Sequence, residues 1–197
     1  MSGATRRAAI VGAAALLGLS ACGAAPPSAE RSTRNDPEAL SSALLALGPG
    51  VEAAEAERMA RIAMDHPLAL ARDWGAVDPP LVHNAQVNLG LKPRGLCYHW
   101  ANAMYARMFE EDFRSLDLHL GLANADNPFR LEHSSLIVSA AGAPMMSGIV
   151  LDPWRLGRGR LFWARAAEDA DYRWRPRGEV LAAQGRVPRD RIVLVRE

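Results

Sequence analysis

The chain has 197 residues, of which 49% are hydrophobic and 23% charged, with 23 basic and 22 acidic side chains. This apolar content excludes a disordered chain, and the length is typical of a single domain. The nearly balanced charge argues against a nucleic-acid-binding protein, which usually presents a strongly basic face.

The first two dozen residues have the pattern of an export signal. Arg6 and Arg7 precede an apolar run from Ala8 to Leu19, which is shorter than the about 20 residues that a membrane-spanning helix needs. A charged start, a short apolar middle and a small-residue end are typical of a secretory signal peptide. The run ends in Leu19-Ser20-Ala21-Cys22, which resembles a bacterial lipobox.

The lipobox resemblance implies that residues 1–21 are a signal peptide, and that the chain is cleaved before Cys22 and lipidated on its sulfur. Because Gly23 follows the cysteine rather than an aspartate, it also implies a lipoprotein of the bacterial cell envelope, anchored in the outer membrane and facing the periplasm. An ordinary signal peptide cut after Ala21 or Ala25 is the alternative.

Residues 22–35 are rich in alanine, proline, serine and polar residues and have no periodicity, so we expect a flexible tether. Residues 36–197 are then the folded domain. With Cys22 lipidated, Cys97 has no intramolecular partner. A lone thiol in an oxidising compartment is expected to be either reactive or deeply buried.

The first half of the domain is predicted to be helical. Asp36-Pro37-Glu38 is a typical helix start, and this helix is expected to continue to Gly48. A second helix is predicted from Val51 to about Ala63, interrupted at His66-Pro67 because the residue before a proline avoids helical angles. A shorter helical piece continues to Trp74. Residues 76–94 hold three prolines and a glycine and are predicted to form a long loop.

A third helix is predicted from Leu96 or Cys97 to about Glu111. Its residues at helical spacing, which should form the buried face, are Cys97, Trp100, Ala101, Met104 and Met108. After this helix, polar and apolar residues alternate with a period of two, which predicts strands over 115–122, 133–140, 147–152 and 189–197. Helices first and an antiparallel sheet afterwards indicate an α+β fold, with the Cys97 helix packed on the sheet.

The segment that begins the third helix carries the clearest chemistry. A thiol attacks carbonyl carbons only as the thiolate, and its free pKa is about 8.5. The unpaired N–H groups of a helix N-terminus favour negative charge, both on Cys97 and on an oxyanion formed from a substrate. Gly95 permits the close turn into this helix.

A nucleophile needs a base, and the base needs an orienting group. His133 begins one predicted strand and Asp152 ends the next. A two-residue turn at Gly142-Ala143 would pair Ala141 with Pro144 and place His133 directly opposite Asp152, on one face of the sheet. Pro144 leaves a wider loop and a shifted register as the alternative.

These residues resemble the transglutaminase-like (papain-like) cysteine enzymes, near the bacterial transglutaminase-like cysteine proteinases. The matching motifs are Gly95-Leu96-Cys97-Tyr98-His99-Trp100-Ala101, His133 at a strand start, and Leu151-Asp152-Pro153-Trp154, together covering about residues 80–155. Members often have an aromatic residue two positions after the histidine, where this chain has Ser135.

The resemblance implies a papain-like domain in which Cys97 is the nucleophile, His133 the general base and then acid, and Asp152 the orienter. The reaction is attack on a protein or peptide amide through a thioester acyl-enzyme, which water resolves in a protease or amidase and an amine in a transglutaminase. It also implies an oxyanion donor upstream of the cysteine, for which Gln86 is the candidate and Asn84 and Asn88 are rivals. No cofactor is implied.

Other polar and aromatic residues are predicted to be structural. His99 lies about 200° from Cys97 around the helix, at about 100° per residue. His66, His83 and His119 lack the spacing of metal ligands, so no metal site is predicted. The tryptophans at 154, 163 and 174 are expected in the core. The arginine-rich stretch over 155–177 is interrupted by acids and is expected to be solvated.

Two classes of function remain. The first is a lipid-anchored cysteine hydrolase, a protease or amidase with a protein or peptide substrate. The second is a catalytically inactive transglutaminase-like lipoprotein that binds or assembles. A peptidoglycan amidase or endopeptidase fits the location but not the motifs. Cell-wall cysteine peptidases more often use a second histidine or another polar residue as the third member of the catalytic triad, and none follows His133 here. The sequence does not determine an oligomeric state.

Overall fold

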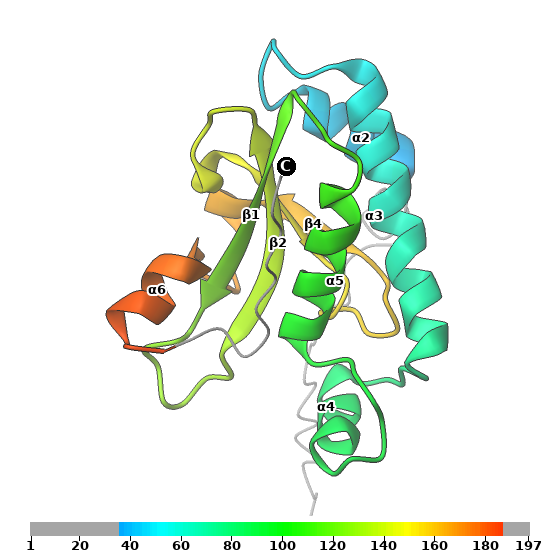
Figure 1. Ribbon diagram of the computed structural model, residues 1–197, viewed down its shortest axis with the longest axis vertical. Coiled ribbons are helices and arrows are strands. Elements are labelled where there is room, and N and C mark those ends of the chain that lie inside the picture. The colour runs from blue at the N-terminus through cyan, green and yellow to red at the C-terminus, as the bar shows by residue number, and fades with distance from the viewer. Residues whose placement is uncertain (1–35, 187–197) are drawn as a thin grey trace, which may run out of the picture.

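The computed structural model describes residues 36–186. The signal peptide, the lipidated Cys22 and the tether that the sequence predicts, and the strand expected over 189–197, lie outside these residues. The helices are α2 (Pro37–Leu45), α3 (Ala53–Asp73), α4 (Pro80–Asn88), α5 (Cys97–Phe109) and α6 (Arg177–Ala183). The strands are β1 (Leu116–Ala123), β2 (His133–Ala140), β3 (Ile149–Asp152), β4 (Phe162–Arg165) and β5 (Arg175–Pro176). The predicted α+β fold is confirmed (Figure 1).

The first helix begins where the sequence predicts, and the second is longer than expected. The Asp36 side chain accepts a hydrogen bond from the Glu38 N–H at 2.9 Å and caps α2. α3 continues through Pro67 without a break, so the predicted interruption at His66-Pro67 is wrong. A buried stripe along α3, which includes Met59, Ala63 and Pro67 itself, packs into the core on both sides of the proline. This burial offsets the missing N–H donor, which costs about 3 kcal/mol in a helix interior.

The long loop predicted over 76–94 is also wrong, because α4 forms within it. Pro80 occupies the first helical turn, where a missing N–H costs nothing and the fixed φ favours the helix. The prolines therefore mark a helix start. Most residues of α4 are at least partly exposed, and these include the hydrophobic Leu81 and Val82, so apolar residues do not mark a single buried face. The amphipathic signal that would have revealed α4 is consequently weak.

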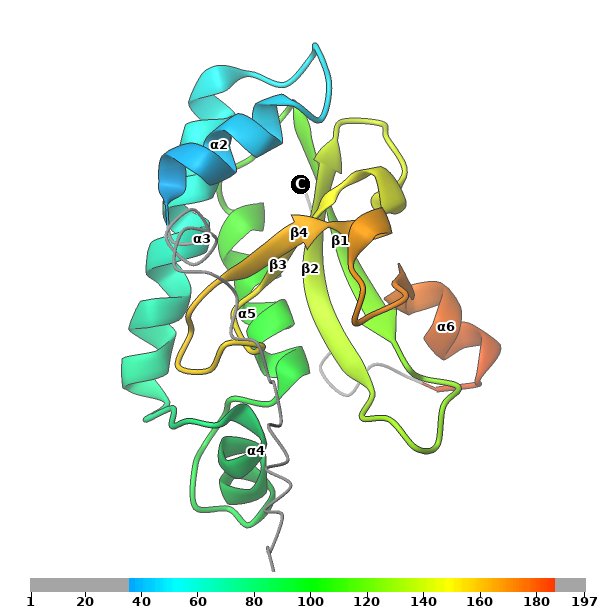
Figure 2. The same cartoon turned by 180° about the vertical axis from the view of Figure 1, so that it is seen from behind.

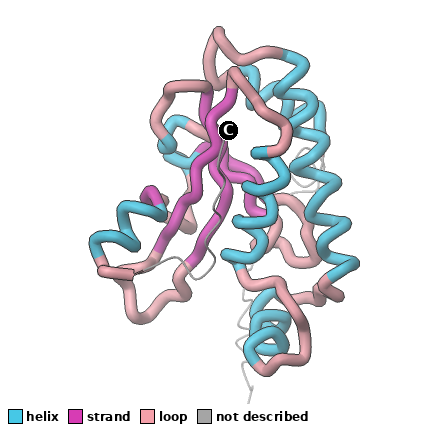
Figure 3. The backbone as a smooth tube through the Cα atoms, in the orientation of Figure 1, coloured by secondary structure: helices cyan, strands magenta, loops and turns pink. Residues whose placement is uncertain are grey.

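The helix that carries Cys97 packs between α3 and the sheet (Figure 3). All five residues predicted for its inner face are buried. Four of them divide between two clusters. Met104 and Met108 join the main core with residues of α2, α3, β2 and β3, while Cys97 and Trp100 pack with Ala71, Trp74 and Trp154. The start of α5 is thus fixed by aromatic packing at one end of the domain.

The sheet is antiparallel throughout, with the strand order β4-β3-β2-β1-β5 (Figure 2). β2 is central and buried on both faces. Leu136 and Val138 point into the helix-side core, and Ile137 points into a second cluster with Met145 and Trp174. Within residues 36–186, no helix combines the length and apolar character needed to cross a bilayer.

The predicted register of β2 and β3 is wrong by two residues. Leu136 pairs with Leu151 and Val138 with Ile149, because a 3₁₀ helix, η1 (Met145–Ser147), lengthens the connection. Continuing this register places Asp152 opposite Ser135, so that His133 and Asp152 are diagonal neighbours. A shift of two residues keeps every side chain on its face, so the two still point the same way.

Candidate active site

Cys97 is the first residue of α5, and the turn before it is held from several sides. Gly95 has a φ of +129°, a value that side-chain-bearing residues rarely adopt. Its carbonyl accepts a hydrogen bond from Trp100 Nε1 at 2.9 Å. Nδ1 of His99 accepts the N–H groups of Gly95 and Leu96 at 3.2 and 3.3 Å. His99 is therefore a helix-capping residue, in agreement with the structural role predicted for it.

The Cys97 side chain is 9% exposed and unpaired. Its thiol donates a weak hydrogen bond to the Glu132 carbonyl, with a sulfur–oxygen distance of 3.6 Å. This contact places the sulfur beside the residue that precedes β2. As the first residue of α5, Cys97 has a backbone N–H without a partner inside the helix, which makes it a hydrogen-bond donor for an anion formed at the sulfur.

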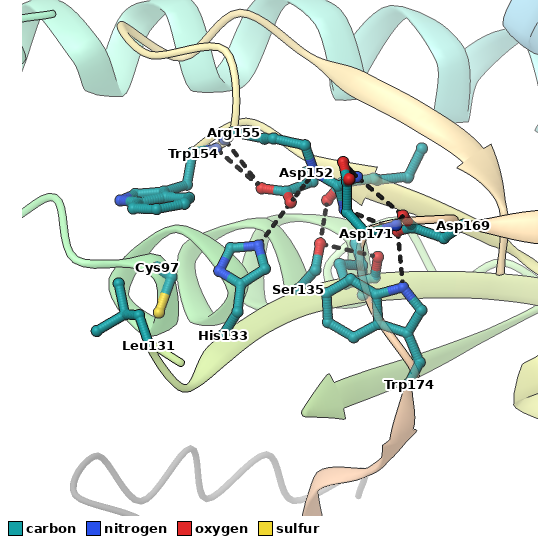
Figure 4. A network of polar contacts seen from close by, with 12 residues as sticks. Cys97, Leu131, His133, Ser135, Asp152, Trp154, Arg155, Asp169, Asp171 and Trp174 are labelled. Atoms are coloured by element: carbon teal, nitrogen blue, oxygen red, sulfur yellow. Dashed lines mark hydrogen bonds and ion pairs between the residues drawn. The ribbon is translucent and has the colours of Figure 1, made fainter. Parts of the chain in front are cut away.

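His133 connects the sulfur to a carboxylate. Its Nε2 lies 2.6 Å from Asp152 Oδ2, and both side chains are buried. Its Nδ1 is buried and makes no hydrogen bond. Figure 4 shows this second nitrogen on the side of the ring that faces Cys97. The structure thus brings Cys97, His133 and Asp152 together, with the two imidazole nitrogens turned to opposite partners.

Every oxygen of the Asp152 carboxylate is engaged. Oδ1 accepts the backbone N–H groups of Trp154 and Arg155 at 3.1 and 3.2 Å. Oδ2 accepts from His133 and, at 3.1 Å, from Arg155 Nε. The Asp-Pro-Trp-Arg turn after β3 therefore folds its own N–H groups back onto the carboxylate, as aspartates often do at turns.

The charges in the site stabilise one another. Burial by itself lowers the pKa of His133, but the negative charge of Asp152, the hydrogen bond to it and the neighbouring Cys97 together raise that pKa to about 9. Burial raises the pKa of Asp152, yet His133 and Arg155 outweigh burial and hold it below its ordinary value. At neutral pH these two shifts favour a pair made of an imidazolium and a carboxylate.

Aromatic side chains enclose the imidazole of His133. The ring centroids of Trp154, Tyr172 and Trp174 lie 4.8, 4.5 and 5.6 Å from its own. The tryptophans at 154 and 174 are buried, as predicted. Ser135 is also buried and donates to the Leu151 carbonyl at 2.9 Å. The aromatic contacts of His133 therefore come from Trp154 and from the 172–174 segment rather than from position 135.

The prediction that the stretch over 155–177 is solvated is wrong at its two ends. The Arg155 side chain is 10% exposed and Arg177 is also buried. The acidic residues between them are the reason for expecting a solvated surface. Instead Asp169 is buried and pairs with Arg155 across the fold, a long-range contact that has no local signal in the sequence.

The upstream amides lie on α4, beyond the end of α5 that begins at Cys97 (Figure 1). Asn84 Oδ1 accepts from Trp154 Nε1 at 3.0 Å, which ties α4 to the aromatic wall around His133. Gln86 is half-buried, and its Oε1 is buried without a hydrogen-bond partner. Asn88 is exposed at the end of α4. Within the part of the chain described, neither Gln86 nor Asn88 forms a hydrogen bond with Cys97.

Metal binding has no visible site in this region. Among residues 36–186, no group of three or more histidine, cysteine, aspartate or glutamate side chains is arranged to hold a metal ion.

Comparisons with protein families, with curated proteins and with solved structures found no match for this chain.

Proposed function

We propose that this chain is a lipid-anchored cysteine hydrolase, a protease or amidase that cleaves a protein or peptide amide through a thioester intermediate. The observation that carries the proposal is the position of His133, whose Nε2 lies 2.6 Å from Asp152 while its Nδ1 faces Cys97. The motif resemblance to transglutaminase-like cysteine enzymes supports the same assignment. The lipobox resemblance at Cys22 supports an outer-membrane anchor that faces the periplasm.

The chemistry follows from the three groups. In the resting site Nδ1 of His133 already holds the Cys97 proton, and the resulting thiolate attacks the carbonyl carbon of the amide. The negative charge that develops on the carbonyl oxygen is stabilised by the Cys97 N–H at the start of α5. The imidazolium then returns its proton to the departing amine, which leaves a thioester on Cys97. Asp152 stabilises the imidazolium and fixes the ring orientation throughout.

Water completes the cycle in the proposed hydrolase. His133 removes a proton from the water, which attacks the thioester carbon, and the imidazolium protonates the Cys97 thiolate as the acid is released. The surface near the sulfur is partly apolar, since the sulfur contacts the Glu132 carbonyl and the preceding residue, Leu131, is 53% exposed.

Alkylation of Cys97 tests the activated thiolate directly. The rate with iodoacetamide at mildly acidic pH is followed by mass spectrometry of the Cys97 peptide, so that Cys22 does not contribute. We expect a rate well above that of a free peptide thiol, because the imidazolium stabilises the thiolate. His133→Gln should lower that rate by about 100-fold or more. His119→Gln is the matched control, since His119 bonds only to Ser139 on the sheet.

A Cys97 that alkylates no faster than a peptide thiol would contradict the proposal and favour an inactive binding protein.

Acylation is tested with p-nitrophenyl acetate, which should give a burst of nitrophenol and an acetylated Cys97. Adding a primary amine then separates the two outcomes. A hydrolase releases acetate at an unchanged rate, whereas a transglutaminase transfers the acetyl group to the amine.

A further inference from the structure

Arg155 contacts the same oxygen of Asp152 that His133 contacts. Its Nε donates to Asp152 Oδ2 at 3.1 Å. The two outer nitrogens of its guanidinium donate to Asp169 at 3.0 and 2.7 Å. The guanidinium carbon also lies 3.8 Å from the ring centroid of Phe162 and 4.6 Å from that of Tyr172. The planar guanidinium has five N–H donors, so it can bind two carboxylates while it stacks against two aromatic rings. The smaller ammonium group of a lysine could not make all of these contacts.

Asp169 is itself held in place, so the arginine has a fixed anchor. The Asp169 side chain is 1% exposed, and its Oδ2 accepts from Trp174 Nε1 at 2.9 Å. Its Oδ1 also accepts the Asp171 N–H at 3.1 Å. Trp174 packs against His133. Arg155 therefore links Asp152, through Asp169, to Trp174 (Figure 4).

The charged and titratable side chains near Asp152 lie on several segments of the fold. His133 of β2 and Arg155 of the following turn are in direct contact. Asp169 and Asp171 reach it only through Arg155, which lies 3.4 Å from the Asp171 carboxylate. The Tyr172 hydroxyl group and Cys97 complete the set of titratable neighbours. Arg155 is thus the cation that separates two buried carboxylates, Asp152 and Asp169.

We propose that Arg155 is a positioning residue of this site, which holds Asp152 ionised and oriented so that His133 keeps Nδ1 turned to Cys97. The inference rests on the proposed function for its catalytic meaning. Its physical content is separate, because it concerns the protonation of a carboxylate that the structure places next to an imidazole. A buried carboxylate beside a guanidinium stays ionised to lower pH than one without it.

The test compares Arg155→Met, which removes the charge but keeps the bulk, with Arg155→Lys. The pH dependence of Cys97 alkylation is measured in the full chain. Without the arginine, Asp152 takes up a proton at higher pH, so we expect the acid limb of the profile to move up by about one pH unit or more. Lysine supplies a charge to one carboxylate only, so its profile should fall between those of Arg155→Met and the parent.

Arg107→Met is the control for loss of a short ion pair. Arg107 lies 2.6 Å from Glu111 near the far end of α5 from Cys97, and its removal should leave the pH profile unchanged. A profile for Arg155→Met that is lowered equally at every pH would overturn the inference, because it would indicate a purely structural role. If Arg155→Met does not fold, Arg155→Lys decides by the same criterion.

An NMR titration of histidine-labelled protein separates this inference from the proposed function. The ring nitrogen shifts of His133 report the charge on Asp152 whether or not Cys97 is reactive. In Arg155→Met an acid-side step should appear at higher pH than in the parent chain. If alkylation of the parent is slow while this step moves, the hydrolase proposal fails and the role of Arg155 stands. If the step does not move, the role of Arg155 is refuted.

Discussion

At the scale of single residues, Gly95 determines where Cys97 lies. A Cβ atom at this position would be 2.1 Å from Nε2 of His83. That ring cannot easily yield, because His83 is buried and its Nε2 donates to the Arg94 carbonyl at 2.8 Å. The left-handed φ and this close approach together explain why glycine precedes the helix.

We expect Gly95→Ala to destabilise the fold and to reduce Cys97 alkylation, since the turn must move to relieve the contact. Gly90→Ala is the control, because Gly90 also has a positive φ, +74°, but no atom within 4 Å of the added Cβ. Strain of this kind costs about 1–2 kcal/mol, and Gly95→Ala should exceed Gly90→Ala in urea unfolding. Equal losses in the two variants would show that His83 yields without cost.

At the scale of elements, Glu55 connects α3 to the start of β1. Its buried carboxylate accepts the N–H groups of Arg114 and Ser115 and, at 2.6 Å, the Ser115 hydroxyl group. Burial raises the pKa of Glu55, but these bonds and the charge of Arg58 outweigh it and leave the pKa below the ordinary value. The helix N-terminus and the strand start are therefore joined by one ionised side chain.

Glu55→Gln should lower the free energy of unfolding at pH 7 by about 1–3 kcal/mol, the usual cost of weakening a charged, buried hydrogen-bond set. Because the folded pKa is depressed, this contribution is present above the unfolded value of 4.5 and is lost as the pH falls through the folded value. Urea unfolding at several pH values measures it. Glu57→Gln removes only an exposed pair with Arg61 and should change stability by less than about 0.5 kcal/mol; an equal effect would refute the special role of Glu55.

At the scale of the whole molecule, the His133–Asp152 pair makes stability depend on pH. The folded pKa of His133 is raised from 6.5 to about 9, so its contribution is fully present below pH 6.5 and is lost as the pH rises to about 9. This rise in the pKa of His133 corresponds to roughly 3–4 kcal/mol. Asp152 acts in the opposite sense, because its pKa is depressed and its contribution is lost as the pH falls below 3.8 through the folded value.

We therefore expect the free energy of unfolding to decline between pH 6.5 and 9, and this decline to vanish in His133→Gln. The measurement is urea unfolding across that range. His119→Gln should retain the decline, since burial lowers the pKa of His119 and puts its titration on the acid side. A decline that persists without His133 would assign it to another group.

Local patterns in the sequence were sufficient for much of this fold. Period-two and helical spacing predict β1, β2, α5 and its inner face closely, because burial of one face follows directly from periodicity. They also put Cys97 at a helix start, His133 at a strand start and Asp152 at a strand end. Proline was misleading in α3 and α4, where packing and its place in the first turn override its usual effect.

Tertiary structure alone decided how the site is supported. The register of β2 and β3 depends on η1, and the sequence does not reveal how that connection folds. Arg155 looked like a surface residue because its main partner, Asp169, lies 14 positions away and both are buried only after the 169–174 segment folds over His133. Periodicity reports which face of an element is covered, but the choice of partner across the fold depends on three-dimensional packing that no local pattern encodes.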